Sequence, residues 1–461
     1  MINKSEDNIK LIREEPKKAV LKLSFPIMLS MILITLYNIS DTLWVSGLGA
    51  DALAAIGLIT PLFSIAVNFG SAIGVGTTSL ISRSIGSENY EQANNSALHA
   101  IFLCILLSII ISILNIIFMK PLLILIGAHD VMDYAMDYSL ITFSFLFVFL
   151  FSNIALAIFD SEGNVRNATL AVFISNILNI ILDPIFIYTL NMGMSGAAWA
   201  TILSASISCI AMAYWMWGKK NMYLDLSFKN FSFNPKLIWD ILKISIPSSV
   251  ESILGSGCLF VINTFLVQAG GATAVAVYTA CMKLIQLAMI PMRGVGSSFF
   301  TVAGVILGKG DYKKLREVSS YAIKLCFLIS IGIMIILWVF PSQIAFLFSY
   351  TEASSELTPQ IANTLRIFSI YALAIPLGTI TTVIFQAAGK TLYCLILTFI
   401  KTLLIEIVFA YLFCFVFGWG VIGIYAAVIM TTFVGGFISY IWSEIFIRNL
   451  ENSSNNQVEE C

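Results

Sequence analysis

Twelve long apolar runs restrict what this chain can fold into more than any other feature of its sequence. A helix of about 20 apolar residues can cross the hydrocarbon core of a bilayer, and each run reaches that length. The runs lie at 24–48, 53–83, 95–119, 132–157, 166–190, 194–217, 240–268, 273–305, 316–340, 357–386, 391–417 and 421–446. Only 11% of the residues are charged, whereas soluble domains carry about 25%. The sequence therefore predicts an all-α polytopic membrane protein with twelve transmembrane helices.

A polar stretch between the sixth and seventh runs divides the chain into two halves. We predict an N-terminal segment at 1–22, a first lobe at 23–217, a connector at 218–239, a second lobe at 240–447 and a tail at 448–461. Lys and Arg gather before the first run, in the connector and after the last run, and they are rare on the opposite side. Because cytoplasmic loops carry the excess of these residues, we expect both termini in the cytoplasm of a multi-pass protein. The polar first 22 residues lead into a full-length run, which is not the pattern of a cleavable signal peptide.

The two halves repeat each other in sequence. KLSFP at 22–26 matches KISIP at 243–247, and DTLWVSGLGADALA from Asp41 aligns with NTFLVQAGGATAVA from Asn263. Near the ends of the halves, GMSGAAWA from Gly193 matches GVIGIYAA from Gly420. Each half holds six spans, so both have the same orientation in the membrane. Two pseudo-symmetric six-helix lobes related by an axis along the membrane normal are typical of transporters, which bind their substrates between the repeats.

The first span, Leu23–Leu48, carries a carboxylate at Asp41. An ionised side chain at the centre of a span costs about 2.5–3.5 kcal/mol on insertion scales, so such a residue is a candidate for function. Tyr37 lies one turn earlier on the same face, and Asn38 lies at i−3. Pro26 near the entry is a candidate hinge, because it removes a helical hydrogen bond and frees a carbonyl.

The fifth span carries a polar stripe. Asn176, Asn179 and Asp183 are spaced i, i+3 and i+7, so they share one helical face. Pro184 directly follows Asp183 and disfavours a regular helix there. Each of Asp41, Asp183, Thr201 and Tyr138 lies six or seven residues from the predicted outer end of its span, roughly 10 Å deep at about 1.5 Å per residue.

A common depth in one lobe predicts a shared site. The oxygen ligands suit a hard cation such as Na⁺, or a carboxylate pair that shares a proton. The alternative is that these are structural polar groups between packed helices. Asn153 and Tyr37 are further candidates for a cavity wall.

The second lobe has charges at membrane depth. Their distances from the outer ends of the spans pair Glu251 with Lys401 and Glu406 with Lys283. A lone charge would be expensive there, so structural ion pairs are one interpretation and a substrate cavity is the other. Arg293 either faces the cavity or extends towards the membrane surface.

Several stretches resemble the multidrug and toxic compound extrusion (MATE) family. They are DTLWVSGLGADALAAIG from Asp41, GSAIGVGTTSLISRSIG at 70–86, and FDSEGN at 159–164 paired with FQAAGK at 385–390. The similarity covers essentially residues 20–447. The Asp in the first span with Asn-x-x-x-Asp in the fifth resembles the DinF-like branch.

The resemblance implies a V-shaped pair of lobes that exports amphipathic compounds, especially organic cations, against H⁺ and/or Na⁺. The cation site it implies is Asp41, Asn179, Asp183 and Thr201, with Tyr138 nearby. One departure concerns the NorM-like branch, which has acidic residues in spans seven and ten. Residues 357–386 contain no carboxylate, which puts a second cation site of that kind in doubt.

The predicted function is a secondary active, ion-coupled multidrug antiporter that works by alternating access. The alternative of a related fold is a flippase for a lipid or lipid-linked saccharide, which would need more basic residues along its cavity. A membrane enzyme has no nucleophile–base pair, metal cluster or nucleotide loop in its favour, since GSAIGVG follows no strand and is typical of helix packing. The eight cysteines are scattered singly and read as small hydrophobic residues. We expect a monomer in a prokaryotic plasma (inner) membrane, with amphipathic small molecules and lipids as partners, no nucleic acid and no cofactor.

Overall fold

The computed structural model describes residues 4–219, 222–228, 231–346 and 356–459, and within these ranges the regular structure is helical throughout. The helices of the first half are α1 (Lys4–Glu14), α2 (Pro16–Ser46), α3 (Ala50–Gly86), α4 (Tyr90–Leu125), η1 (His129–Val131), α5 (Met132–Ser144), α6 (Leu146–Ser161), α7 (Val165–Pro184), η2 (Ile185–Thr189), α8 (Gly193–Ala213) and η3 (Tyr214–Gly218). Those of the second half are α9 (Pro235–Ala288), α10 (Ile290–Lys309), α11 (Tyr312–Val339), α12 (Pro341–Phe346), α14 (Thr358–Ser369), α15 (Tyr371–Ala387), α16 (Thr391–Phe399), η5 (Ile400–Glu406), α17 (Ile407–Tyr411), η6 (Leu412–Val416) and α18 (Gly420–Glu459).

The helices agree with the predicted fold class. Among the described residues, ten helices are long and apolar enough to cross a membrane, and two bent pairs bring the number of spans to twelve. The bent pairs are η1–α5 with α6, at 49°, and α14 with α15, at 50°. The sequence predicted each pair as one run, at 132–157 and at 357–386, and hydropathy alone does not report a bend. The predicted connector at 218–239 includes 220–221 and 229–230, which lie outside the described residues, as do 1–3 and 460–461 of the predicted terminal segments.

The chain forms two compact units, and their bounds cut through a helix. Unit 1 comprises Met1–Glu15 and Leu29–Ile246, and unit 2 comprises Pro16–Met28 and Pro247–Cys461. The N-terminal part of α2 therefore packs with the second half of the chain. Ser298 on α10 donates a hydrogen bond to the carbonyl of Val20 at 2.9 Å. A Cβ atom at Gly294 would lie 3.2 Å from the carbonyl oxygen of Ser24, so a glycine lets α10 approach α2 closely.

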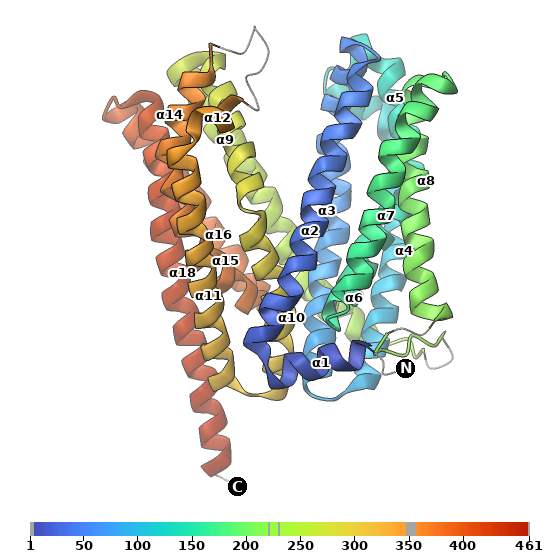
Figure 1. Ribbon diagram of the computed structural model, residues 1–461, viewed down its shortest axis with the longest axis vertical. Coiled ribbons are helices and arrows are strands. Elements are labelled where there is room, and N and C mark those ends of the chain that lie inside the picture. Colours follow the sequence, from blue (N-terminus) through green and yellow to red (C-terminus); the bar gives the residue numbers. More distant parts are fainter. Residues whose placement is uncertain (1–3, 220–221, 229–230, 347–355, 460–461) are drawn as a thin grey trace. The chain divides into compact units, whose positions relative to one another are not determined.

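Within unit 1, α3 packs against α4 and α6, and α7 packs against α8 (Figure 1). The glycine-rich stretch at 70–86 forms much of the contact between α3 and α6. A Cβ atom at Gly70 would lie 3.0 Å from Leu150, and one at Gly74 would lie 3.3 Å from Ala157. The prediction that these glycines serve helix packing is confirmed.

Within unit 2, α10, α11 and α15 pack on one another, and α15 packs against the long helix α18. Phe385 is fully buried in a cluster with Cys394 and Leu397, next to Trp442. Phe385 belongs to FQAAGK, one partner of the predicted repeat. Its counterpart Phe159 in FDSEGN is also fully buried, beside Trp215.

The sequence repeat is also a repeat of backbone conformation. Gly49 separates α2 from α3 with φ 108°, and its aligned partner Gly271 interrupts α9 with φ 70°. Gly193 and Gly420, which begin α8 and α18, have φ values of 54° and 58°. These left-handed conformations cost little only for glycine, which explains why glycine stands at both copies of each turn. Because of the break at Gly271, α9 contains the seventh span and the first part of the eighth.

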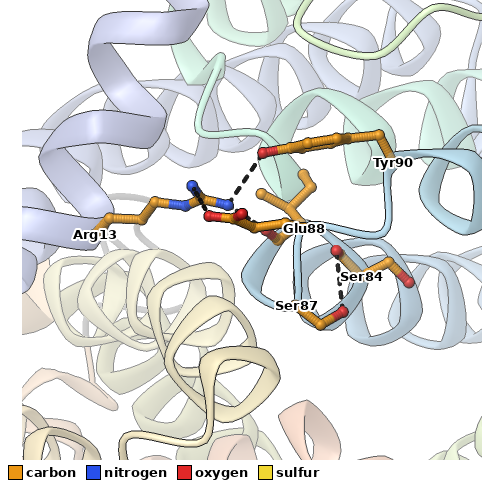
Figure 2. A network of polar contacts seen from close by, with 6 residues as sticks. Arg13, Ser84, Ser87, Glu88 and Tyr90 are labelled. Carbon is orange, nitrogen blue, oxygen red and sulfur yellow. Dashed lines mark hydrogen bonds and ion pairs between the residues drawn. The ribbon is translucent and has the colours of Figure 1, made fainter.

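The short helix α1 packs on unit 1 with its apolar face, where Ile9 and Ile12 are buried. Figure 2 shows the polar contacts at its C-terminal end. Arg13 forms an ion pair with Glu88 at 2.9 Å and donates hydrogen bonds to the carbonyl of Ile85 at 2.6 Å and to the hydroxyl of Tyr90 at 3.2 Å. The Ile85 carbonyl lies in the last turn of α3, where a cation is favourable. Arg13 thus fastens α1 to the end of α3.

Candidate functional site

The predicted polar stripe of the fifth span is buried in unit 1. Asn176, Asn179 and Asp183 lie on α7 with 7%, 1% and 0% of their surfaces exposed. The α-helix ends at Pro184 and continues as the π-helical turn η2. The expected disturbance of the helix at Asp183 is therefore present.

A hydrogen-bonded cluster joins α7 to α8. The amide nitrogen of Asn179 donates to Oδ1 of Asp183 at 3.1 Å and to Oγ1 of Thr201 at 3.3 Å. The Thr201 hydroxyl in turn donates to the carbonyl of Ala197 at 3.0 Å. The structure therefore brings together three residues that the sequence placed in one site.

The side chains of α2 and α5 complete this cluster. Asp41 interacts electrostatically with Asp183, and the Tyr37 hydroxyl forms a hydrogen bond with Thr201. Tyr138 on α5 interacts electrostatically with Asp41, Tyr37 and Asp183. Four helices thus contribute to one polar cluster within unit 1.

The oxygen atoms of the cluster are not all satisfied by the protein. Oδ1 of Asp41, Oδ1 of Asn179 and Oδ2 of Asp183 are buried and accept no hydrogen bond from any residue that the structure describes. Buried polar atoms are normally paired, so each orphan requires an explanation. Unpaired acceptor oxygens near two carboxylates fit a proton or a hard cation, which would supply the missing positive charge. Among the described residues there is no group of three or more His, Cys, Asp or Glu that could hold a metal ion, so Na⁺ would need the neutral oxygens of Asn179 and Thr201.

Other candidate residues of the first half lie outside this cluster. The side chain of Asn38 is exposed on α2. Asn153 on α6 accepts a hydrogen bond from Ser71 on α3 at 3.2 Å and donates to the Phe149 carbonyl, so it ties two helices together. Asn176 shares the stripe, but its amide nitrogen donates no hydrogen bond to the part of the chain that the structure describes. Pro26 lies inside a continuous α2, two residues before the boundary between the units at Met28 and Leu29.

Sequence reasoning missed Tyr188 on η2. Its hydroxyl donates a hydrogen bond to the carbonyl of Trp44 on α2, and the two rings pack edge to face with centroids 6.3 Å apart. A Cβ atom at Gly47 would collide with the same hydroxyl. Tyr188 therefore holds the end of α2 that carries Asp41, and the glycine at 47 was the only sign of this contact in the sequence.

Unit 2 contains a cavity of about 550 Å³ between α9, α10, α15, η5 and α18. Three charged side chains line it, namely Arg293, Lys401 and Glu406. Lys401 and Glu406 lie at the two ends of the π-helical turn η5. A π-helix closes hydrogen bonds from i to i+5, and such turns are frequent at functional sites.

Of the two predicted charge pairs, Glu251 with Lys401 is present and Glu406 with Lys283 is not. Lys401 interacts electrostatically with Glu406 and also with Glu251, which accepts a hydrogen bond from Thr398 at 3.1 Å. The predicted pairing of Glu406 with Lys283 is wrong, because the Lys283 side chain is exposed and Lys401 is the cation near Glu406. Depth along a span does not tell which face of the helix a residue occupies.

A glycine accommodates the stem of Lys401. A Cβ atom at Gly435 on α18 would lie 2.5–2.7 Å from Cγ, Cδ and Cε of Lys401. The side chain passes over this position, and its Nζ ends near Gly378 on α15. The lysine is thus held in place by packing as well as by the two carboxylates.

Comparison with known proteins identifies the family. The family model MatE matches residues 26–185 and 247–412, which lie on both copies of the repeat. The chain belongs to the MATE family of membrane transporters. It is therefore a transport protein and not an enzyme, as the sequence predicted.

The similarity to individual MATE proteins extends over most of the chain. The probable multidrug resistance protein YoeA of Bacillus subtilis is 22% identical over 417 residues, which cover 87% of this chain and 89% of YoeA. The multidrug export protein MepA of Staphylococcus aureus is 26% identical over 382 residues, which cover 81% and 82% of the two chains. A crystal structure of MATE in complex with MaL6 matches with a TM-score of 0.93 at 34% identity, over 96% of this chain and 99% of that one.

Proposed function

We propose that this MATE-family chain is a secondary active exporter of amphipathic, chiefly cationic small molecules, coupled to inward H⁺ and/or Na⁺. One observation carries the proposal: in one cluster, three buried acceptor oxygens, on Asp41, Asn179 and Asp183, have no hydrogen-bond partner among the described residues. The names of the relatives, which include a multidrug export protein, support the substrate class.

The coupling follows from the electrostatics of the two carboxylates. Asp41 and Asp183 repel each other in a medium of low dielectric unless a proton or a cation lies between them. The tyrosines Tyr37 and Tyr138 and the hydroxyl of Thr201 surround the pair with neutral polar groups. The first unit therefore offers an ion a site whose occupancy changes the charge at the ends of α2 and α7.

Transport requires that the ion prefers one conformation. An ion shifts a conformational equilibrium only through its differential affinity for the two states. Asp41 lies on α2, whose two parts belong to different units with Pro26 close to the boundary. Bending or repacking of α2 near Pro26 would change the distance between Asp41 and Asp183 and therefore the affinity of the site for the ion. Ion and substrate would then compete, because each would favour a different conformation of α2.

The test is efflux from proteoliposomes with a pH gradient and a Na⁺ gradient imposed separately. Asp41→Asn keeps the size of the side chain but cannot carry the negative charge. We expect the variant to lose at least about tenfold in gradient-driven efflux, because an uncharged side chain at position 41 cannot bind the coupling ion electrostatically. Expression and thermal stability should stay close to those of the unmodified protein.

Asp51→Asn is the matched control, because it makes the same change at an exposed residue in the first turn of α3. It should leave efflux unchanged. An Asp41→Asn protein that exports at the normal rate under either gradient would refute the coupling site.

A further inference from the structure

We propose that the cavity of unit 2 is a binding site for an amphipathic organic anion, a molecule with a carboxylate or phosphate head and an apolar body. Its volume of about 550 Å³ lies within the range of small-molecule pockets. The cavity is built from unit 2 alone, on helices that carry none of the residues of the Asp41–Asp183 cluster.

Of the three charged side chains that line the cavity, two are cationic, Arg293 and Lys401, and one is anionic, Glu406. Lys401 has Glu406 and Glu251 as counter-ions, and Glu406 has Lys401. Arg293, by contrast, has no ion pair or hydrogen bond from its guanidinium within the part of the chain that the structure describes. It interacts electrostatically with the hydroxyl of Tyr371, which also lines the cavity. The Arg293 side chain is exposed. An arginine at membrane depth is expensive unless it faces a water-filled cavity, and in that position its guanidinium can bind a ligand of opposite charge.

A second polar group also lacks a partner at this cavity. The Thr431 side chain on α18 lines it and is only 2% exposed, and its hydroxyl has no hydrogen-bond partner in the described ranges of the chain. An unmade hydrogen bond of a buried hydroxyl costs about 1–3 kcal/mol. A ligand with acceptor oxygens would satisfy both this hydroxyl and the guanidinium of Arg293.

Part of the remaining wall suits an apolar body, beside polar residues such as Gln286 and Gln386. Met282, Met289 and Met292 line the cavity together with Ile285. Methionine side chains are flexible and polarisable, so they adapt to apolar groups of different shape. The cavity therefore combines one fixed polar end with an adaptable apolar wall.

The test uses two ligands that share a tail and differ in the sign of the head. Octyl phosphate and octyltrimethylammonium are titrated calorimetrically into the full-length protein in phosphatidylcholine nanodiscs, without any ion gradient. We expect octyl phosphate to bind more tightly than octyltrimethylammonium. Arg293→Gln should lower the affinity for octyl phosphate by more than about tenfold. Thr431→Val should lower it by about three- to tenfold. Arg293→Lys should lower it less than Arg293→Gln does.

Arg366→Gln is the matched control. It removes the same charge from an exposed arginine of unit 2 that does not line the cavity, and it should leave both affinities unchanged. Equal binding of the two heads, or tighter binding of the ammonium, would overturn the proposal. An equal loss in Arg366→Gln and Arg293→Gln would do the same, because the attraction would then be a general surface effect. Should Arg293→Gln not fold, Thr431→Val and Arg293→Lys carry the test.

The source of the anion is a separate arm. In nanodiscs that contain phosphatidylglycerol, this anionic lipid would compete for the cavity if the natural ligand is a lipid. A lower affinity for octyl phosphate in these nanodiscs would assign the cavity to a membrane lipid. Unchanged affinity would assign it to a dissolved anion. Because no gradient is applied, this experiment is independent of the Asp41 efflux test.

Discussion

Thr201 is the residue at which the identity of the coupling ion can be tested. A Na⁺ ion needs several oxygen ligands, whereas a proton needs only a carboxylate pair. Thr201→Val keeps the shape of the side chain and deletes the neutral oxygen that lies 3.3 Å from Asn179 Nδ2. We expect Na⁺-driven efflux to fall much more than H⁺-driven efflux, measured in proteoliposomes with one gradient at a time.

The control for this prediction is Thr77→Val. Thr77 is also buried, and its hydroxyl also donates to the carbonyl four residues earlier, that of Ile73. Thr77 lies on α3, which carries none of the residues of the cluster. Thr77→Val should therefore reduce neither kind of efflux. If efflux ignores Na⁺ at every pH, or if Thr201→Val affects both gradients equally, the Na⁺ interpretation fails.

At the scale of residues, the spacing in the sequence was sufficient to predict which side chains meet in the first half of the chain, but not in the second half. The positions of Asn179, Asp183 and Thr201 could be predicted because a helical period and a common depth place them on facing sides of neighbouring spans. The partner of Glu406 could not, since depth fixes the height of a charge but not its direction around the helix. Tyr188 was missed because a tyrosine near the end of a span is usually an interfacial anchor.

Among the elements, α1 is held by interactions of different kinds from those at the start of α2. Arg13 donates to a helix-terminal carbonyl and to a carboxylate, whereas Lys17 makes one exposed ion pair with Glu317 at 3.2 Å. Arg13→Gln should therefore lower stability by about 1–2 kcal/mol, and Lys17→Gln by no more than about 0.5 kcal/mol. Thermal unfolding with limited proteolysis of the first 15 residues would measure both. Equal effects of the two changes on stability would contradict the inference that Arg13 fastens α1 to the end of α3.

A buried carboxyl in the loop after α6 makes the stability of unit 1 depend on pH. Glu162 is fully buried and accepts hydrogen bonds from the backbone N–H groups of Tyr223 and Leu224 and from Asn164. Burial raises the pKa of this carboxyl from about 4.5 to about 7, in spite of these hydrogen bonds. Between these values the folded protein holds a proton that the unfolded chain has lost. The contribution of Glu162 to stability is therefore complete below about pH 4.5 and declines as the pH rises through 7.

Glu162→Gln should remove this dependence while it keeps an acceptor oxygen. We expect the melting temperature of the variant to change less between pH 5 and 8 than that of the unmodified protein. The same change at Glu91, an exposed residue in the first turn of α4, should preserve the original slope. A slope that survives Glu162→Gln would show that another group titrates.

The regular parts of the elements followed from the sequence, and their irregular parts did not. Twelve apolar runs predicted twelve spans, because a bilayer demands that length of every helix. The bends of 49° and 50° and the π-helical turns such as η5 were not predicted. These features add or displace single residues, and a hydropathy pattern averages over many.

On the scale of the whole molecule, the bounds of the two units could not be predicted from hydropathy. The longest polar stretch marks the middle of the chain, but the segment at 16–28 belongs with the second half. Its contacts there are made by individual residues, for example Val20 with Ser298. Hydropathy does not mark the boundary between Met28 and Leu29, because the apolar run at 24–48 continues across it.

A severed chain would test this division. We expect residues 229–461 to fold when they are co-expressed with 1–228, and also with 16–228, which lacks α1 but keeps the segment at 16–28. They should not fold with 29–228. Size-exclusion chromatography and protease resistance of the purified complexes would report the outcome. Full recovery with 29–228 would show that the segment is dispensable for unit 2.

The shared helix α2 also has a consequence for the order in which the protein can be made. Residues 16–28 are synthesised well before Ser298, which lies 278 residues after Val20 and donates a hydrogen bond to the Val20 carbonyl. Until then this segment lacks its partners in unit 2, and the translocation machinery or the surrounding lipid must keep it. Unit 1 can mature while synthesis continues, whereas unit 2 is complete only when its later residues meet the segment at 16–28.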